Sequence, residues 1–123
     1  PATYAKTLIG KAMSHDAKVY LVNTGWNGTG KRISLKNTRA IIDSIIDGSI
    51  MNAETIHIPV LNLEAPTSLS NVDEGILDPR ATYPSAADWE VKARILAARY
   101  IQNFEQYCDN QAARELREAG PQL

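Results

Sequence analysis

The chain is 123 residues long with a mass of 13.5 kDa, and its 44% hydrophobic and 22% charged residues are typical of a soluble globular domain. Thirteen basic and fourteen acidic side chains nearly cancel, so the composition predicts no nucleic-acid or membrane partner. The single cysteine, Cys108, cannot form a disulfide framework or a multi-cysteine metal site, which favours a cytoplasmic location.

A helix and a strand are predicted at the start of the chain. Between residues 3 and 14, apolar side chains recur every three or four residues, which predicts a helix that packs one face against the protein. The stretch "KVYLVNT" (18–24) is rich in β-branched and aromatic residues and ends at Gly25. It therefore predicts a buried strand.

A second helix and strand are predicted after the glycine-rich stretch "NTGWNGTGKRIS" (23–34). Ser34 is the expected N-cap of a helix that stops near Gly48. The apolar stripe of this helix is formed by Ile41, Ile42, Ile45 and Ile46. A short strand is expected over "TIHIP" (55–59), and the resulting order of elements predicts an α/β fold.

The C-terminal half is predicted to be an irregular segment followed by helix. Residues 59–85 contain four of the six prolines and show no convincing periodicity, and so long a loop suggests contact with another surface. "SAAD" (85–88) resembles a capping box that opens a long amphipathic helix. The tail after residue 111 predicts a short polar helix ended by Gly120 and Pro121.

The glycine-rich stretch partly matches a phosphate-binding loop. From Gly25 to Lys31 the letters G-W-N-G-T-G-K fit the pattern G-x-x-x-x-G-K-[ST], and residues 17–42 contain no acid. Arg32, however, stands where a hydroxyl should bind Mg²⁺, and Ser34 would start the helix two residues late. The residues alone leave three interpretations open: a triphosphate loop, another nucleotide or anion contact, and a structural glycine turn.

The same stretch, read with its surroundings, resembles a known enzyme family. "YLVNTGWNGTGKRISLKNTRAIIDSIIDGSI", together with "ILDPR" and the closing helix, resembles the C-terminal end of ATP-dependent phosphoenolpyruvate carboxykinase. The resemblance implies that residues 1–123 are a single segment, the C-terminal part of a mixed-sheet mononucleotide-binding domain that ends in a long amphipathic helix. Family members with a longer glycine loop give no guide to the details of this shorter one.

The resemblance also implies an activity for the parent enzyme. Carboxykinases of this type convert oxaloacetate and ATP to phosphoenolpyruvate, ADP and CO₂ in gluconeogenesis, a lyase reaction that uses Mg²⁺ and Mn²⁺. The family's phosphate loop, metal ligands and catalytic residues lie upstream of the matched region. The expected partners are thus ATP, oxaloacetate and the remainder of the same polypeptide, and the isolated chain is expected to be inactive.

Three residues match family positions that contact ATP: Arg32 and Ile33 at the adenine, and Thr38 at a further point. A guanidinium can stack on a base, an isoleucine backbone can meet the ring edge, and a threonine hydroxyl can form one hydrogen bond. Each also has a structural interpretation, as a surface cation, a residue packing before the helix cap, and a helix-surface residue. His15 and His57 lack partners at metal-ligand spacing, so no metal site is predicted.

The sequence is also compatible with two other functions. One is a non-catalytic α/β module that binds an anion or a protein through the basic glycine-rich loop. The other is a small stand-alone nucleoside triphosphatase, against which Arg32 counts because it replaces the metal-binding hydroxyl.

Overall fold

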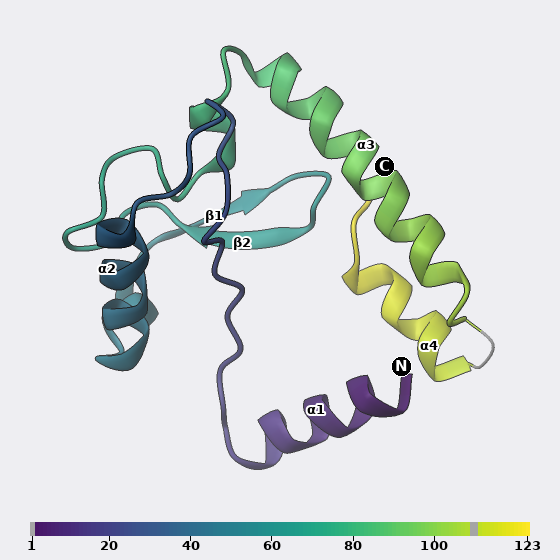
Figure 1. Cartoon of the computed structure of the whole chain (residues 1–123). Coiled ribbons are helices and arrows are strands. Elements are labelled where there is room, and N and C mark those ends of the chain that lie inside the picture. Colours follow the sequence, from purple (N-terminus) through teal and green to yellow (C-terminus); the bar gives the residue numbers. More distant parts are fainter. Residues whose placement is uncertain (1, 109–110) are drawn as a thin grey trace.

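The computed structural model of the protein describes residues 2–108 and 111–123, and Figure 1 shows it as helices around one small sheet. In chain order the elements are α1 (Ala2–Ser14), α2 (Leu35–Ile46), η1 (Ser49–Asn52), β1 (Thr55–Ile58), β2 (Leu63–Pro66), η2 (Pro79–Thr82), α3 (Ala86–Glu105), α4 (Gln111–Glu115) and η3 (Leu116–Ala119). The described part of the chain thus combines helices with a two-stranded antiparallel sheet. No helix in this part is long and apolar enough to cross a membrane.

The sheet is a hairpin of β1 and β2. Its register pairs Thr55 with Pro66 and Ile58 with Leu63. The turn between the strands uses left-handed backbone at Val60 (φ 66°) and Asn62 (φ 55°). The C-terminal tail holds this turn, because Gln122 N donates to the Val60 carbonyl at 2.9 Å. The predicted strand at 55–59 is therefore confirmed, whereas β2 was not anticipated within the irregular segment.

The core lies between the hairpin and the first half of α3. Ile58, Trp89 and Ala93 form the buried cluster, with partly buried apolar residues such as Tyr83 packed against it. The start of α3 is fixed by Ser85, whose side chain accepts from Asp88 N at 3.1 Å and donates to Asp88 Oδ2 at 2.7 Å. The predicted capping box and long helix are confirmed. The buried residues of α3 are Trp89, Ala93 and Ala97, whereas Leu96 and Tyr100 are exposed.

The predicted buried strand at 18–24 is wrong for the described structure. This segment has no regular secondary structure, and Leu21 is 83% exposed. A strand satisfies its backbone groups through a neighbouring strand, and no described segment pairs with this one. Figure 1 shows it as an extended connection that leads from α1 to the glycine-rich loop.

The predicted N-terminal helix forms, but the expectation that it packs one face is wrong. Tyr4 is 82% exposed and Met13 is 78% exposed, and Leu8 and Ile9 are exposed as well. Figure 1 shows α1 lying away from the sheet, beyond the extended segment. The apolar face of α1 therefore has no cover among the residues that the structure describes.

Helix α2 begins as predicted, and its predicted apolar stripe is covered only in part, with Ile41 and Ile45 half-buried. Ser34 caps it by accepting from Asn37 N at 3.1 Å, and Gly48 follows its end in left-handed backbone (φ 79°). The buried residues of α2 are Asn37, Thr38, Ala40 and Ser44, whereas Ile42 and Ile46 of the isoleucine stripe are exposed. The reason is that α2 docks through polar groups onto the loop around Asp73.

Candidate functional site

The glycine-rich loop is a closed hairpin organised by one side chain, that of Asn27. Asn27 Oδ1 accepts hydrogen bonds from Thr29 N at 3.0 Å, Thr29 Oγ1 at 2.6 Å and Lys31 N at 3.3 Å. The backbone closes the same turn, because Asn27 N donates to the Lys31 carbonyl at 2.9 Å and Gly30 N donates to the Asn27 carbonyl at 3.0 Å. Gly30 supplies the left-handed backbone that the turn needs (φ 73°). Asparagine commonly holds a turn in this way.

These bonds use the N–H groups that a phosphate-binding loop would aim at its ligand. Thr29, Gly30 and Lys31 all donate towards Asn27. Gly28 N donates to Thr82 Oγ1 at 2.9 Å. Lys31 also lies four residues before α2 begins at Leu35, so it is outside the first turn of the helix. The geometry opposes a triphosphate loop, and any anion bound here would meet side chains rather than the backbone nest.

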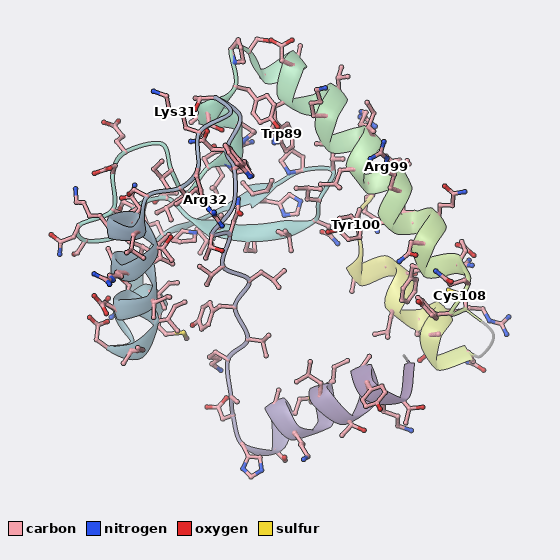
Figure 2. The ribbon with its side chains drawn as sticks, viewed as in Figure 1. Lys31, Arg32, Trp89, Arg99, Tyr100 and Cys108 are labelled. Atoms are coloured by element: carbon pink, nitrogen blue, oxygen red, sulfur yellow. The ribbon has the colours of Figure 1, made fainter. Side chains whose placement is uncertain are left out.

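Arg32 and Trp26 form the paired positions at the base of the hairpin. They form an isolated antiparallel bridge, and the flanking bonds run from Ile33 N to the Gly25 carbonyl and from Asn27 N to the Lys31 carbonyl. Trp26 and Arg32 are thus a non-hydrogen-bonded pair, the kind in which facing side chains lie closest. Trp26 is 69% exposed, and Arg32 is exposed while its Nε donates to the Thr24 carbonyl at 3.3 Å. The bridge therefore places a planar cation and an indole at facing positions beside the loop, and Figure 2 shows Arg32 at the base of this hairpin.

Ile33 and Thr38 bracket the cap of α2. With Ser34 as N-cap, Ile33 occupies the position before the cap and Thr38 the fourth helical position, whose side chains commonly pack together. Both residues are 9% exposed. The structure therefore brings these two predicted site residues to one helix start, with Arg32 one residue away on the hairpin.

Some polar groups of Ile33 and Thr38 are already hydrogen-bonded within the protein, and others are available to a ligand. The Ile33 N–H is used by the Gly25 carbonyl at 2.8 Å, whereas no described residue donates to the Ile33 carbonyl. The Thr38 hydroxyl forms no side-chain hydrogen bond with a described residue. Among the described residues no buried side-chain polar atom lacks a partner, so this hydroxyl keeps contact with solvent. One acceptor and one hydroxyl are available at this helix start.

The basic side chains around the loop differ in whether they form a salt bridge. Lys36 Nζ forms a salt bridge to Asp73 Oδ1 at 2.9 Å, and hydrogen bonds from Lys36 and then Asn37 hold the pKa of Asp73 below its usual value. Lys31, Arg32 and Arg39 are exposed and have no salt bridge to any residue in the described ranges. The positive charge available to a ligand therefore lies at Lys31, Arg32 and Arg39.

A cavity of about 230 Å³ separates the loop from the start of α3. Of the three predicted site residues, Ile33 lines this cavity, whereas Arg32 and Thr38 do not. Its other walls include Trp26 and Asn27 on the loop side and Tyr83 and Trp89 on the far side. Figure 2 shows Trp89 projecting from α3 on the side facing the loop.

The described residues do not fit a divalent metal. No group of three or more His, Cys, Asp or Glu side chains within residues 2–108 and 111–123 could hold one. His57 pairs instead with Glu64 across the hairpin, at 2.9 Å from Nδ1 to Oε1. The Mg²⁺ and Mn²⁺ implied by the resemblance have no assigned ligands in this part of the protein.

The comparison with known families decides the relationship. A family model described as phosphoenolpyruvate carboxykinase, of the ATP type, matches residues 1–75, more than half of the chain. The chain belongs to this family. The part matched to the carboxykinase model includes the whole glycine-rich loop and all of α2, hence Arg32, Ile33 and Thr38. The matched range ends before "ILDPR" (76–80) and α3, so the resemblance of those carboxykinase segments stays a prediction.

Two features of the carboxykinase loop were not found from the sequence. The role of Asn27 had a signal, because asparagine before a glycine-rich turn often bonds to backbone two residues on. The contact between Gly28 and the Thr82–Tyr83 pair had none, because it joins positions more than fifty residues apart.

Proposed function

We propose that this chain supplies adenine contacts to a carboxykinase that converts oxaloacetate and ATP to phosphoenolpyruvate, ADP and CO₂. The observation that carries the proposal is the family match over residues 1–75, which includes the loop and helix start that bear Arg32, Ile33 and Thr38. On this proposal the chain is one segment of a nucleotide-binding domain in a cytoplasmic enzyme, and the remainder of the polypeptide supplies the phosphate loop and the metal ligands.

The proposed adenine site uses three different kinds of contact. The exposed Arg32 guanidinium stacks on the base, and the neighbouring Trp26 limits the directions that this side chain can take. The Ile33 carbonyl accepts from the exocyclic amino group of adenine, since its N–H is already used by Gly25. The Thr38 hydroxyl completes the site with one hydrogen bond.

On this proposal the phosphates of ATP are bound by the remainder of the polypeptide. Phosphoryl transfer depends on positioning and on charge supplied by metals and basic groups around the phosphates. The loop N–H groups here are used internally, and no described cluster fits a metal. We therefore expect the isolated 123 residues to form no phosphoenolpyruvate, and measurable product from the purified chain would contradict this division of labour.

The uncovered apolar surface supports the presence of a further part of the same polypeptide against this chain. The exposed face of α1 and the exposed 18–24 segment, which has strand composition, both fit burial by another element. On the proposal, residues 18–24 join a mixed sheet whose other strands come from the rest of the enzyme.

The deciding experiment replaces Arg32 in the full-length enzyme and measures steady-state kinetics for both substrates. Arg32→Ala should raise the KM for ATP by about tenfold, as expected for loss of a cation–π contact in a partly desolvated site, and leave the KM for oxaloacetate nearly unchanged. Arg32→Lys should have a KM for ATP nearly as high as that of Arg32→Ala, because an ammonium has no planar face to stack on the base. Arg99→Ala is the matched control, since Arg99 is also exposed and lies on α3, outside the proposed site. Equal effects of Arg32→Ala on both substrates would count against the adenine assignment.

A further inference from the structure

The glycine-rich loop rests on a second segment of the chain through Gly28. A Cβ atom at position 28 would lie 2.2 Å from Cδ2 and 2.5 Å from Cε2 of Tyr83, well inside any real contact. The Gly28 N–H also donates to Thr82 Oγ1 at 2.9 Å. Position 28 therefore has to be glycine for the loop to lie flat on the Tyr83 ring while keeping this hydrogen bond.

The segment under Gly28 is itself firmly held. Thr82 Oγ1 donates to the Pro79 carbonyl at 2.9 Å, which leaves its lone pairs for the Gly28 N–H. Asp78 caps η2 by accepting from Arg80 N at 2.9 Å, and the same carboxylate binds the Arg80 guanidinium at 2.9 Å. Tyr83 packs on the core cluster of Ile58, Trp89 and Ala93. The support thus connects the loop to the hydrophobic core.

The support for Gly28, formed by Thr82 and Tyr83, is linked to Arg32 and Ile33 through a short path of covalent and hydrogen bonds. Gly28 lies inside the turn that Asn27 closes, and Arg32 is paired with Trp26 at the base of that turn. A shift of Gly28 away from Tyr83 moves the closed turn as a unit. Its base, which carries Arg32 and Ile33, moves with it.

We propose that Thr82 and Tyr83 are positioning residues for the adenine contacts, because they fix Gly28 and with it the hairpin that presents Arg32 and Ile33. The inference rests on the proposed function above. It adds a role for residues outside the range that the family model matches. Neither residue touches the nucleotide in this scheme. Because both act through Arg32 and Ile33, their loss affects ATP binding and leaves oxaloacetate binding unchanged.

The test uses the full-length enzyme with Thr82→Val, which keeps the shape of the side chain and removes its hydroxyl, and with Gly28→Ala. Both should raise the KM for ATP about fivefold to tenfold and change the KM for oxaloacetate less than twofold, as expected when a positioned contact is displaced. Thr82→Ser should restore the KM for ATP, because it returns the hydroxyl. Thr67→Val is the matched control, since Thr67 is exposed at the end of β2 and far in sequence from the loop.

A second measurement tests the hydrogen bond between Gly28 and Thr82 without using enzyme activity. Hydrogen exchange at the Gly28 amide should be at least tenfold faster in Thr82→Val than in the parent protein and unchanged in Thr67→Val, because only the former loses the acceptor. If Arg32→Ala raises the KM for ATP while Thr82→Val and Gly28→Ala do not, the positioning role is wrong and the adenine assignment stands. If Arg32→Ala has no selective effect on ATP, the adenine assignment fails and the positioning role fails with it.

Discussion

Asn37 and Asp73 bind each other through two hydrogen bonds that run in opposite directions. The Asn37 amide donates from Nδ2 to Asp73 Oδ2 at 3.1 Å, and Asp73 N donates to Asn37 Oδ1 at 3.0 Å. Asn37 is 2% exposed, so this pair attaches the start of α2 to a loop thirty-six residues further along the chain.

Removing the Asn37 side chain should therefore destabilise the protein substantially. Asn37→Ala leaves the Asp73 N–H without its partner at a partly buried contact, and the free energy of unfolding should fall by about 1–3 kcal/mol. Urea unfolding followed by circular dichroism measures this change. Lys36→Ala is the control, because its exposed salt bridge to the same carboxylate should contribute about 0–1 kcal/mol. Equal losses in the two variants would show that the ion pair, not the buried amide, holds the loop.

Acid should weaken the same contact. Hydrogen bonds from Lys36 and then Asn37 lower the pKa of Asp73, so the folded state favours the charged carboxylate. The resulting stabilisation is fully present above the unfolded pKa of about 3.9 and is lost as pH falls through the lower folded pKa. Asp73→Asn should flatten the dependence of stability on pH below about pH 5, measured by urea unfolding across the acid range. A slope identical to that of the parent protein would contradict the contribution of Asp73.

The acceptor proposed at Ile33 can be tested from the ligand side. An ATP analogue whose exocyclic amino group carries two methyl groups cannot donate to the Ile33 carbonyl, and it leaves that acceptor unpaired. Its KM in the full-length enzyme should exceed that of ATP by about five-fold to a hundred-fold, with the KM for oxaloacetate unchanged. An analogue accepted as well as ATP would show that this carbonyl does not read the base.

The proposed sheet partner of residues 18–24 predicts slow hydrogen exchange in the full-length enzyme. These residues have no backbone partner strand among the described residues, so alternate amides should become protected only when a neighbouring strand is present. We expect at least a hundred-fold slowing relative to unprotected peptide rates, measured by exchange and mass spectrometry. Free exchange across 18–24 would mean that this segment stays outside any sheet.

Local signals in the sequence predicted local structure well. The caps at Ser34 and Ser85 and the end of α2 near Gly48 were all anticipated, because each depends on a few neighbouring residues. The replacement of a hydroxyl by Arg32 argued against a phosphate loop, and the N–H groups of Thr29 and Lys31, which donate to Asn27, are a separate observation that points the same way.

Features that depend on distant partners were not predictable in the same way. The composition of 18–24 indicates a strand, but a strand exists only where another segment supplies its hydrogen bonds. The isoleucine stripe of α2 suggested an apolar buried face, yet the helix docks through Asn37 onto Asp73. The roles of Arg32, Ile33 and Thr38 came from the family resemblance and remain predictions, because local geometry alone also explains Ile33 and Thr38 as helix-start residues.

The closure of the loop by Asn27 has a consequence for the energetics of binding. Asn27 accepts three hydrogen bonds within the turn, and Gly28 is held from outside it by Thr82, so these contacts come from the chain itself. The conformational entropy of ordering this turn is thus lost during folding, and a nucleotide meeting Arg32 and Ile33 need not order it again. Such a loop should show similar backbone order parameters with and without nucleotide, so that affinity changes here reflect altered contacts more than altered flexibility.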